Sequence, residues 1–321
     1  MFAARGLAVS LSVFLLVYCA LSLAVCLTWR KVWIRLEKQY VQKHLVRRVA
    51  DLLFAWRMFP LVTAAVITAA FTVPSFILLE PRAIDEPLGG IPLALGVTGA
   101  ALGLFGLVNA GLAVRRASRT ISTWTREAQV VETTSPVPVL RIARTFPAMT
   151  AAGIVRPRVL LSSAAEFVLN TNELRTALNH EVAHVRRRDN LKKLLLRFVA
   201  FPGMSGLETA WREVTEMAAD DAAVSKAGDA LDLAAALIKL SRLGPVEAPV
   251  DLTAALVHSP ASAMNARVER LIAWCEERRV PTQTRSAWYG VGAAMATVAV
   301  FAFTYSQLLV RVHTATEWLV R

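Results

Sequence analysis

Four long uncharged apolar runs dominate the pattern of hydrophobic and polar positions along this chain. They cover residues 7–27, 59–79, 90–114 and 287–310, and each contains at least 21 residues. A helix of about 20 apolar residues spans the hydrocarbon core of a bilayer. The pattern therefore predicts a membrane protein with four transmembrane helices, the first three within residues 1–114.

The basic residues predict how these spans are oriented. The connection at 28–58 carries eight Lys and Arg residues against two acidic ones, whereas the connection at 80–89 carries one Arg against three acidic residues. Short connections rich in Lys and Arg stay on the cytoplasmic side of a membrane. We therefore expect a cell (inner) membrane protein with a basic cytoplasmic loop at 28–58, a cytoplasmic segment at 115–286 and a short external tail at 311–321.

Two short runs rich in β-branched residues predict a small hairpin or sheet early in the segment 115–286. They cover residues 137–143 and 158–162, and prolines and a glycine separate them. An edge of this sheet can bind an extended peptide by strand addition. The alternative is a sheet that only packs against a helix, and the pattern leaves both possibilities open.

Helical periodicity follows the predicted sheet. Asn170 with Glu173 three residues later forms a helix N-cap signal, and apolar residues then recur at helical spacing. Residues 211–224 and 229–243 predict two further helices. The run LKKLLLRFVAF at 191–201 is too short to span a bilayer, so it predicts either a helix buried in the domain core or one lying at the membrane surface.

Composition and charge narrow the partners of this protein. The chain is 55% hydrophobic and has a formal net charge of +12. Basic proteins often bind nucleic acid, but the basic loop at 28–58 is what anionic lipid and the insertion machinery favour, and no nucleic-acid module accompanies it. We therefore expect contact with the lipid bilayer and no direct contact with nucleic acid.

The chemistry of the chain centres on an H-E-x-x-H motif. His180, Glu181 and His184 stand in LNHEVAHVRRRDN, and the chain has only five histidines. On a helix, residues four apart share a face, so both imidazoles can bind one zinc ion while the glutamate beside them activates a water molecule. The competing interpretation is a pair of histidines on a solvated helix that forms salt bridges with nearby arginines.

A catalytic zinc site needs a third protein ligand and one open position. The predicted helix at 211–224 carries Glu216 and Asp220 on one face, with alanines that allow close approach to a neighbouring helix. Glu216 can serve as the third ligand, while Asp220, one turn on, can accept the second N–H of a ligating histidine. An acidic face that only balances nearby arginines is the alternative.

These motifs together resemble a known family. HEVAHVRRRDN, the preceding GIVRPRVLLS and the later E-x-x-A-D of Glu216 to Asp220 are similar to the BlaR/MecR-type integral-membrane zinc metallopeptidases and, more distantly, to the HtpX and CAAX endopeptidases. The resemblance implies a mainly α protein, with four transmembrane helices and a cytoplasmic α+β zinc protease domain of the mini-gluzincin type between the third and fourth. It also implies His180, His184 and Glu216 as zinc ligands and Glu181 as general base.

The resemblance to the CAAX-type enzymes suggests two further candidate site residues. His258 and the later RVERL run that begins at Arg267 resemble a stretch that lies near the metal in those enzymes, although the spacing differs. The resemblance therefore implies that His258 or Arg267 stabilises the transition state. A surface histidine and a structural arginine are the alternatives.

The substrate is less defined than the reaction. BlaR/MecR-type proteins carry an external antibiotic-sensing domain after the fourth span, whereas this chain ends about ten residues past that span. We expect regulated proteolysis of a protein substrate such as a transcriptional repressor, with the signal supplied by the spans or by a partner sensor protein. The alternatives are HtpX-like quality control of membrane proteins and a non-catalytic membrane receptor or scaffold.

Overall fold

A computed structural model describes most of the chain. The described residues are 2–43, 45–81, 89–133, 135–143, 147–199, 201–243, 252–255, 261–274 and 304–317. Most of the predicted fourth span lies outside these residues, as does His258. Only the end of that span falls within a described helix, at 304–317.

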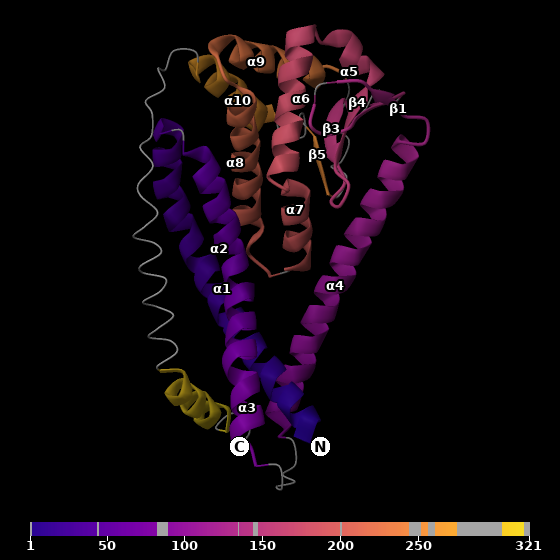
Figure 1. The fold of residues 1–321 in the computed structure, drawn as a ribbon. Coiled ribbons are helices and arrows are strands. Elements are labelled where there is room, and N and C mark those ends of the chain that lie inside the picture. The colour runs from indigo at the N-terminus through magenta and orange to yellow at the C-terminus, as the bar shows by residue number, and fades with distance from the viewer. Residues whose placement is uncertain are drawn as a thin grey trace. The chain divides into compact units, whose positions relative to one another are not determined.

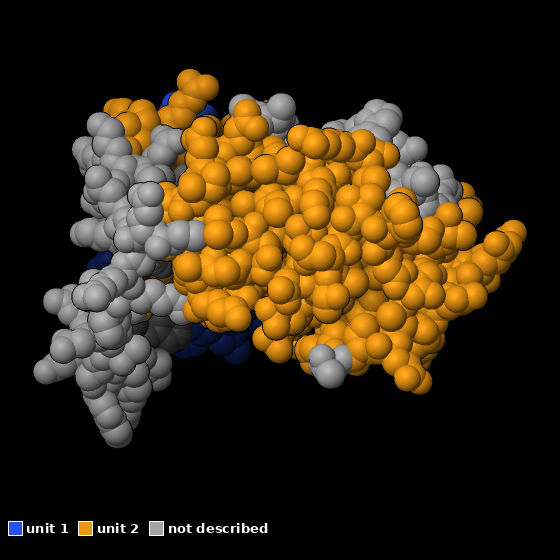
Figure 2. Space-filling view, turned by 90° about the horizontal axis from the view of Figure 1, so that it is seen from above, with its two compact units in different colours: residues 1–28, 58–105, 279–321 blue, residues 29–57, 106–278 orange. Residues whose placement is uncertain are grey.

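The chain divides into two compact units, which Figure 2 colours separately. The first unit consists of residues 1–28, 58–105 and 279–321. The second consists of residues 29–57 and 106–278, and it contains both the H-E-x-x-H motif and Glu216.

Long helices supply the membrane-spanning candidates. They are α1 (Phe2–Lys43), α2 (Val46–Ile67), the π-helical turn η1 (Thr68–Thr72), α3 (Val73–Leu79) and α4 (Gly90–Trp124). Among the described residues, three helical stretches are long and apolar enough to cross a membrane, and they contain the first three predicted spans.

The connection at 28–58, predicted as a basic cytoplasmic loop between the first two spans, is helical over nearly its whole length. Helix α1 continues to Lys43 and α2 begins at Val46. The connection contains neither Gly nor Pro and is rich in Lys, Arg and Leu, which all favour helix. Charge at a membrane surface therefore does not imply irregular backbone here.

The second unit contains a five-stranded sheet with the order β1-β2-β4-β3-β5. Strands β2 and β4 pair in parallel, and the other neighbours pair antiparallel. The strands are β1 (Gln129–Val131), β2 (Val139–Ile142), β3 (Met149–Ala152), β4 (Arg158–Ser162) and β5 (Thr253–Ala255).

The two predicted β-runs became β2 and β4, but they do not form a hairpin with each other. The hairpin joins β3 to β4 and turns at Gly153, whose φ of 91° favours glycine. Strand β3 has the sequence MTAA, which lacks the β-branched run that marks a strand, so the sequence did not reveal it.

Both faces of the sheet are covered by helices. Val159 and Leu161 of β4 belong to a core that includes residues of α6 and α9, whereas Leu160 packs on the opposite face with Trp124 at the end of α4. Successive residues of a strand point to opposite faces, so an apolar run such as RVLLS suits a strand buried on both sides. The sheet thus supports α6, the helix that carries the H-E-x-x-H motif.

Six helices complete the second unit, and Figure 1 shows α6 between the sheet and α8. They are α5 (Ser163–Val168), α6 (Thr171–Arg186), α7 (Asp189–Phe198), α8 (Ser205–Ala223), α9 (Ala227–Ser241) and α10 (Ala261–Trp274). The predicted helices at 211–224 and 229–243 correspond to α8 and α9.

Helix α7 contains most of the run for which the sequence left two interpretations open. Leu196 is buried, and Leu194 packs against Ala113, Ala117 and Leu252. Leu195 is the more exposed leucine, at 36%. The packing therefore favours burial within the second unit over a helix lying on the membrane surface.

Candidate metal centre

The helix that carries H-E-x-x-H is anchored at its first turn. Asn170 Oδ1 accepts hydrogen bonds of 2.9 and 3.0 Å from two backbone N–H groups, and the Glu173 carboxylate accepts one of 2.9 Å from the Asn170 N–H. This capping box confirms the predicted helix start. His180, Glu181 and His184 lie on the buried side of α6 and are at most 2% exposed.

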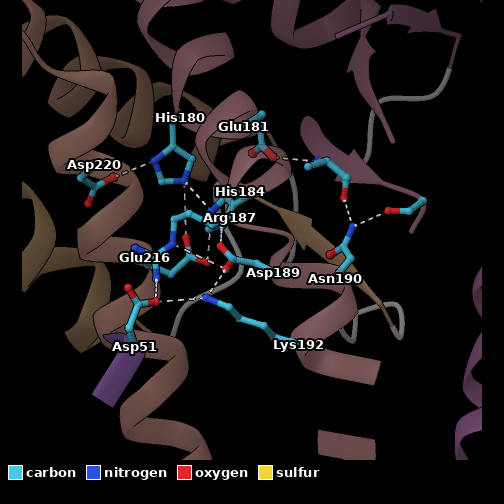
Figure 3. Close-up of polar contacts among 12 residues, drawn as sticks. Asp51, His180, Glu181, His184, Arg187, Asp189, Asn190, Lys192, Glu216 and Asp220 are labelled. Carbon is cyan, nitrogen blue, oxygen red and sulfur yellow. Dashed lines mark hydrogen bonds and ion pairs between the residues drawn. The ribbon is translucent and has the colours of Figure 1, made fainter. Parts of the chain in front are cut away.

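Helix α8 brings Glu216 to the two histidines, as Figure 3 shows. The Glu216 carboxylate oxygens lie 3.5 Å from His180 Nε2 and 3.6 Å from His184 Nε2, and the two Nε2 atoms are 3.1 Å apart. Ligand atoms of a tetrahedral metal ion with bonds of about 2.0–2.1 Å lie roughly 3.3 Å from one another. The spacing of these three donors therefore fits one tetrahedral ion with a fourth position open.

Each histidine has a carboxylate at its other ring nitrogen. Asp220 Oδ1 lies 2.9 Å from His180 Nδ1, and Asp189 Oδ2 lies 2.8 Å from His184 Nδ1. Both aspartates are at most 1% exposed. Such partners fix the ring orientation and the tautomer, so that each Nε2 is available as a donor to a metal ion.

Asp189 was not among the predicted site residues, because its distance of five residues from His184 does not match a helical face. Helix α6 ends at Arg186, and Arg188 adopts a left-handed conformation with φ 53° and ψ 40°. This conformation is uncommon for a residue other than glycine. This short break between the helices places Asp189, the first residue of α7, beside His184 in the last turn of α6.

Arg267 of α10 is buried, and its guanidinium lies against the acidic side of the site. Its Nε and Nη2 donate hydrogen bonds of 2.8 and 2.7 Å to the two oxygens of Asp220, and its Nη1 lies 3.4 Å from Glu216 Oε2. This geometry orients Asp220, which in turn orients His180. A role for Arg267 or His258 at the transition state stays a prediction.

Glu181 contacts the sheet rather than α8. Its Oε2 accepts a 2.6 Å hydrogen bond from the Ala151 N–H of β3, while its buried Oε1 has no hydrogen-bond partner among the described residues. Asn190 of α7 donates bonds of 3.1 and 3.2 Å to the carbonyl oxygens of Ala151 and Gly153. One carboxylate oxygen is thus held in place and the other remains able to accept a proton.

The sequence did not predict the contacts of Ala151 and Asn190. Backbone N–H and C=O groups occur at every non-proline residue, so the side-chain pattern carries no signal for them. Asn190 does follow the H-E-x-x-H motif closely, in the run RRRDN. Its place in that run was the only sequence feature that could have drawn attention to it.

The acidic groups of the site favour positive charge at the histidines. Burial lowers the pKa of His184, but the carboxylates of Glu216 and Asp189 outweigh burial and raise that pKa to about 10. Burial also opposes the charge of Glu216, yet the two histidines and Arg267 hold the pKa of Glu216 well below its ordinary value. A divalent cation would meet the same demand for positive charge without protonating the histidines.

Glu181 differs from the other carboxylates. Burial raises its pKa above the ordinary value for a glutamate, and this outweighs the opposing effect of the two histidines. A carboxylate whose pKa is shifted toward neutral pH can take up and release a proton under physiological conditions. The site therefore combines three metal donors with one adjacent group suited to acid–base chemistry.

Comparison with known proteins adds a family to this geometry. The sequence model of the family described as BlaR1 peptidase M56 matches residues 90–272, which is more than half of the chain. The match extends from the start of α4 into α10 and so includes every site residue placed above. The comparison with curated proteins gives no match.

Proposed function

Because the chain belongs to the BlaR1 family of M56 peptidases, which are membrane-associated metallopeptidases, we propose that it is a zinc-dependent endopeptidase of the HExxH type. His180, His184 and Glu216 would hold the zinc ion, and Glu181 would act as general base. We also propose that the protein lies in the inner membrane with its second unit on the cytoplasmic side. This orientation rests on the Lys- and Arg-rich connections described above.

The proposed reaction is hydrolysis of a peptide bond. A bound zinc ion would supply a Lewis acid that lowers the pKa of a water molecule and polarises the scissile carbonyl. Glu181 Oε1 takes the proton of the attacking water and then delivers it to the leaving amine nitrogen. The hydrogen bond from the Ala151 N–H holds the carboxylate in place during both transfers.

The observation that carries this proposal is the separation of the three donor atoms, which lie 3.1 to 3.6 Å from one another. Buried Glu181 lies beside them, on the same helix as the two histidines. The alternative of a structural zinc in a receptor or scaffold would require four protein ligands, usually including cysteine. The group formed by His180, His184 and Glu216 contains three ligands, and none is cysteine. An open coordination position favours chemistry.

Peptide binding is proposed along strand β3, on the side where β5 pairs with it. Ala151 of β3 pairs with Ala254 of β5, and the same Ala151 contacts Glu181 and Asn190 through its N–H and C=O groups. An extended peptide that pairs with β3 here would align its scissile bond beside Glu181. Such a peptide would have to take the place of β5.

Replacing Glu181 by Gln tests the assignment. The amide cannot accept the water proton, so we expect peptide cleavage by the purified full chain to fall at least about a hundredfold, within the range that general bases contribute, while zinc content stays near one per chain. Glu269→Gln, on the exposed side of α10, is the matched control and should retain full activity. Undiminished cleavage by Glu181→Gln would contradict the proposal.

The biological role is proposed to be regulated proteolysis of one or a few protein substrates, such as a transcriptional repressor. The Glu181→Gln protein can retain bound substrates, which mass spectrometry of the captured proteins would identify. A narrow substrate set supports regulation. Capture of many unrelated membrane proteins would instead support HtpX-like quality control.

A further inference from the structure

Helix α2 contacts the helices of the candidate metal centre through one face. Asp51, Phe54 and Arg57 are spaced three residues apart, and together with α7 and α8 they lie in the second unit. The Phe54 ring centroid is 5.9 Å from that of Trp211, and Arg57 Nε donates a 3.0 Å hydrogen bond to Glu208. Both partners lie on α8, so α2 is joined to the helix that supplies Glu216.

Asp51 of α2 lies close to cations at the end of α6 and on α7, as Figure 3 shows. Its Oδ1 lies 3.1 Å from Lys192 Nζ and 3.6 Å from Arg187 Nη2. The same two cations face Asp189 Oδ1, at 3.9 Å from Lys192 Nζ and 3.6 Å from Arg187 Nε. Asp189 uses its other oxygen to bond His184.

The guanidinium of Arg187 lies at the same distance from the Asp51 and Asp189 carboxylates. Its side chain is 9% exposed, and none of its three guanidinium nitrogens forms a hydrogen bond among the described residues. A buried arginine normally hydrogen-bonds its partner, and charge-assisted bonds of this kind are about 2.7–2.9 Å long. At 3.6 Å from both Asp51 and Asp189, the guanidinium is bound closely by neither.

The charge on Asp51 therefore controls how much positive charge reaches Asp189. If Asp51 is removed or withdrawn, Arg187 and Lys192 are free to approach Asp189 and form close ion pairs with it. Asp189 then becomes a poorer hydrogen-bond acceptor for His184 Nδ1, and the imidazole becomes a weaker metal ligand.

We infer that Asp51 is a positioning residue of the metal centre, which couples helix α2 to the ligand His184 through Arg187, Lys192 and Asp189. This inference rests on the proposed zinc site. Helix α2 extends past Arg57 to Ile67, with Pro60 inside it, and belongs to a candidate membrane span.

The test measures zinc affinity of the purified full chain by competition with a chromophoric chelator. Loss of an outer partner of a metal-bound histidine costs about 10- to 100-fold in affinity, and Asp51 acts one contact further out. We expect Asp51→Asn to lower zinc affinity about three- to tenfold and to shift the visible absorption bands of the Co²⁺-loaded protein. Asp51→Glu keeps the carboxylate and should lie closer to the wild-type protein in both measurements.

Asp232→Asn on α9 is the matched control, because the same chemical change is made where no ion pair or hydrogen bond was found in the described part of the chain. It should leave both readouts unchanged. The Asp51 side chain is 53% exposed, so an amide there is compatible with folding. Thermal unfolding of the two variants checks this directly.

A double-mutant cycle with Asp189→Asn separates coupling from a general structural effect. Because the route passes through Asp189, Asp51→Asn should have no further effect on zinc affinity once Asp189 is an amide. An equal loss in both backgrounds would overturn the inference, and so would an affinity of Asp51→Asn within about twofold of wild type, below the expected range. Failure of the wild-type chain to bind zinc at all would instead remove the proposed function itself.

Discussion

The two histidines of the candidate metal centre have different surroundings although they sit on the same helix. His180 faces Asp220, whose carboxylate is gripped by Arg267 through hydrogen bonds of 2.7 and 2.8 Å. His184 faces Asp189, whose nearest cations, Arg187 and Lys192, lie at 3.6 and 3.9 Å. Those two cations are shared with Asp51 of α2, whereas the guanidinium of Arg267 lies against two acidic groups of α8.

This difference indicates a division of roles within one site. A bidentate arginine–carboxylate pair that is fully buried has one preferred geometry, so the His180 side is held rigidly. Loosely paired charges have several arrangements of similar energy, and Asp51 on this side is 53% exposed, so the His184 side can respond to its surroundings. The metal centre therefore has one side that sets its geometry and one side on which helix α2 can act.

The largest expected effect comes from breaking the rigid side. Arg267→Met leaves the Asp220 carboxylate buried without its partner, and removal of one member of a buried ion pair costs about 3–5 kcal/mol. We expect the free energy of unfolding of the second unit to fall by that amount in denaturant titrations of the purified protein. Arg187→Met should cost less, because Lys192 remains near Asp189.

Arg270→Met is the matched control for this prediction. Arg270 pairs with Asp221 between the same two helices, at 2.7 Å, but both side chains are partly exposed, at 18% and 24%. Ion pairs near the surface contribute about 0–1 kcal/mol. If Arg267→Met were no more harmful than Arg270→Met, the His180 side would not be the rigid one.

The next effect concerns the aspartates themselves. Asp220→Asn should weaken zinc binding about 100-fold, because the amide holds His180 poorly and also frees Arg267 to draw Glu216 away from the metal. Asp189→Asn should weaken zinc binding only about tenfold, the lower end of the range for such partners. The reason is that Arg187 and Lys192 pair only loosely with Asp189 and can rearrange around the amide. Chelator competition measures both, and a reversed order of the two affinities would contradict the comparison.

The smallest effect is a dependence on salt. The Debye length falls from about 10 Å at 0.1 M to about 3 Å at 1 M salt, and exposed pairs are screened far more than buried ones. The ratio of zinc affinities between wild type and Asp51→Asn should therefore approach one at high salt. The corresponding ratio for Asp220→Asn should stay within about twofold, since burial protects that contact from screening. A salt-independent Asp51 ratio would show that its effect is not electrostatic.

Much of the fold was predictable from local patterns. Three uncharged runs marked the three candidate spans, and the Asn170–Glu173 capping box marked the start of α6. Both signals are contained in a short stretch of sequence. The charges of the connection at 28–58 indicated a membrane surface, but they did not indicate that its backbone is helical. Strand β3 was missed because the pairing that makes it a strand comes from β4 and β5.

The sequence by itself determined the donor set of the candidate site, since His180, His184 and Glu216 lie on two helices whose periodicity places them on single faces. Only the tertiary structure decided what surrounds those donors. Asp189 reaches His184 through one left-handed residue, Arg267 arrives from α10, and Asp51 comes from a helix more than a hundred residues earlier in the chain. Periodicity reports neighbours along one helix, whereas the charges that tune a buried group come from every element packed against it.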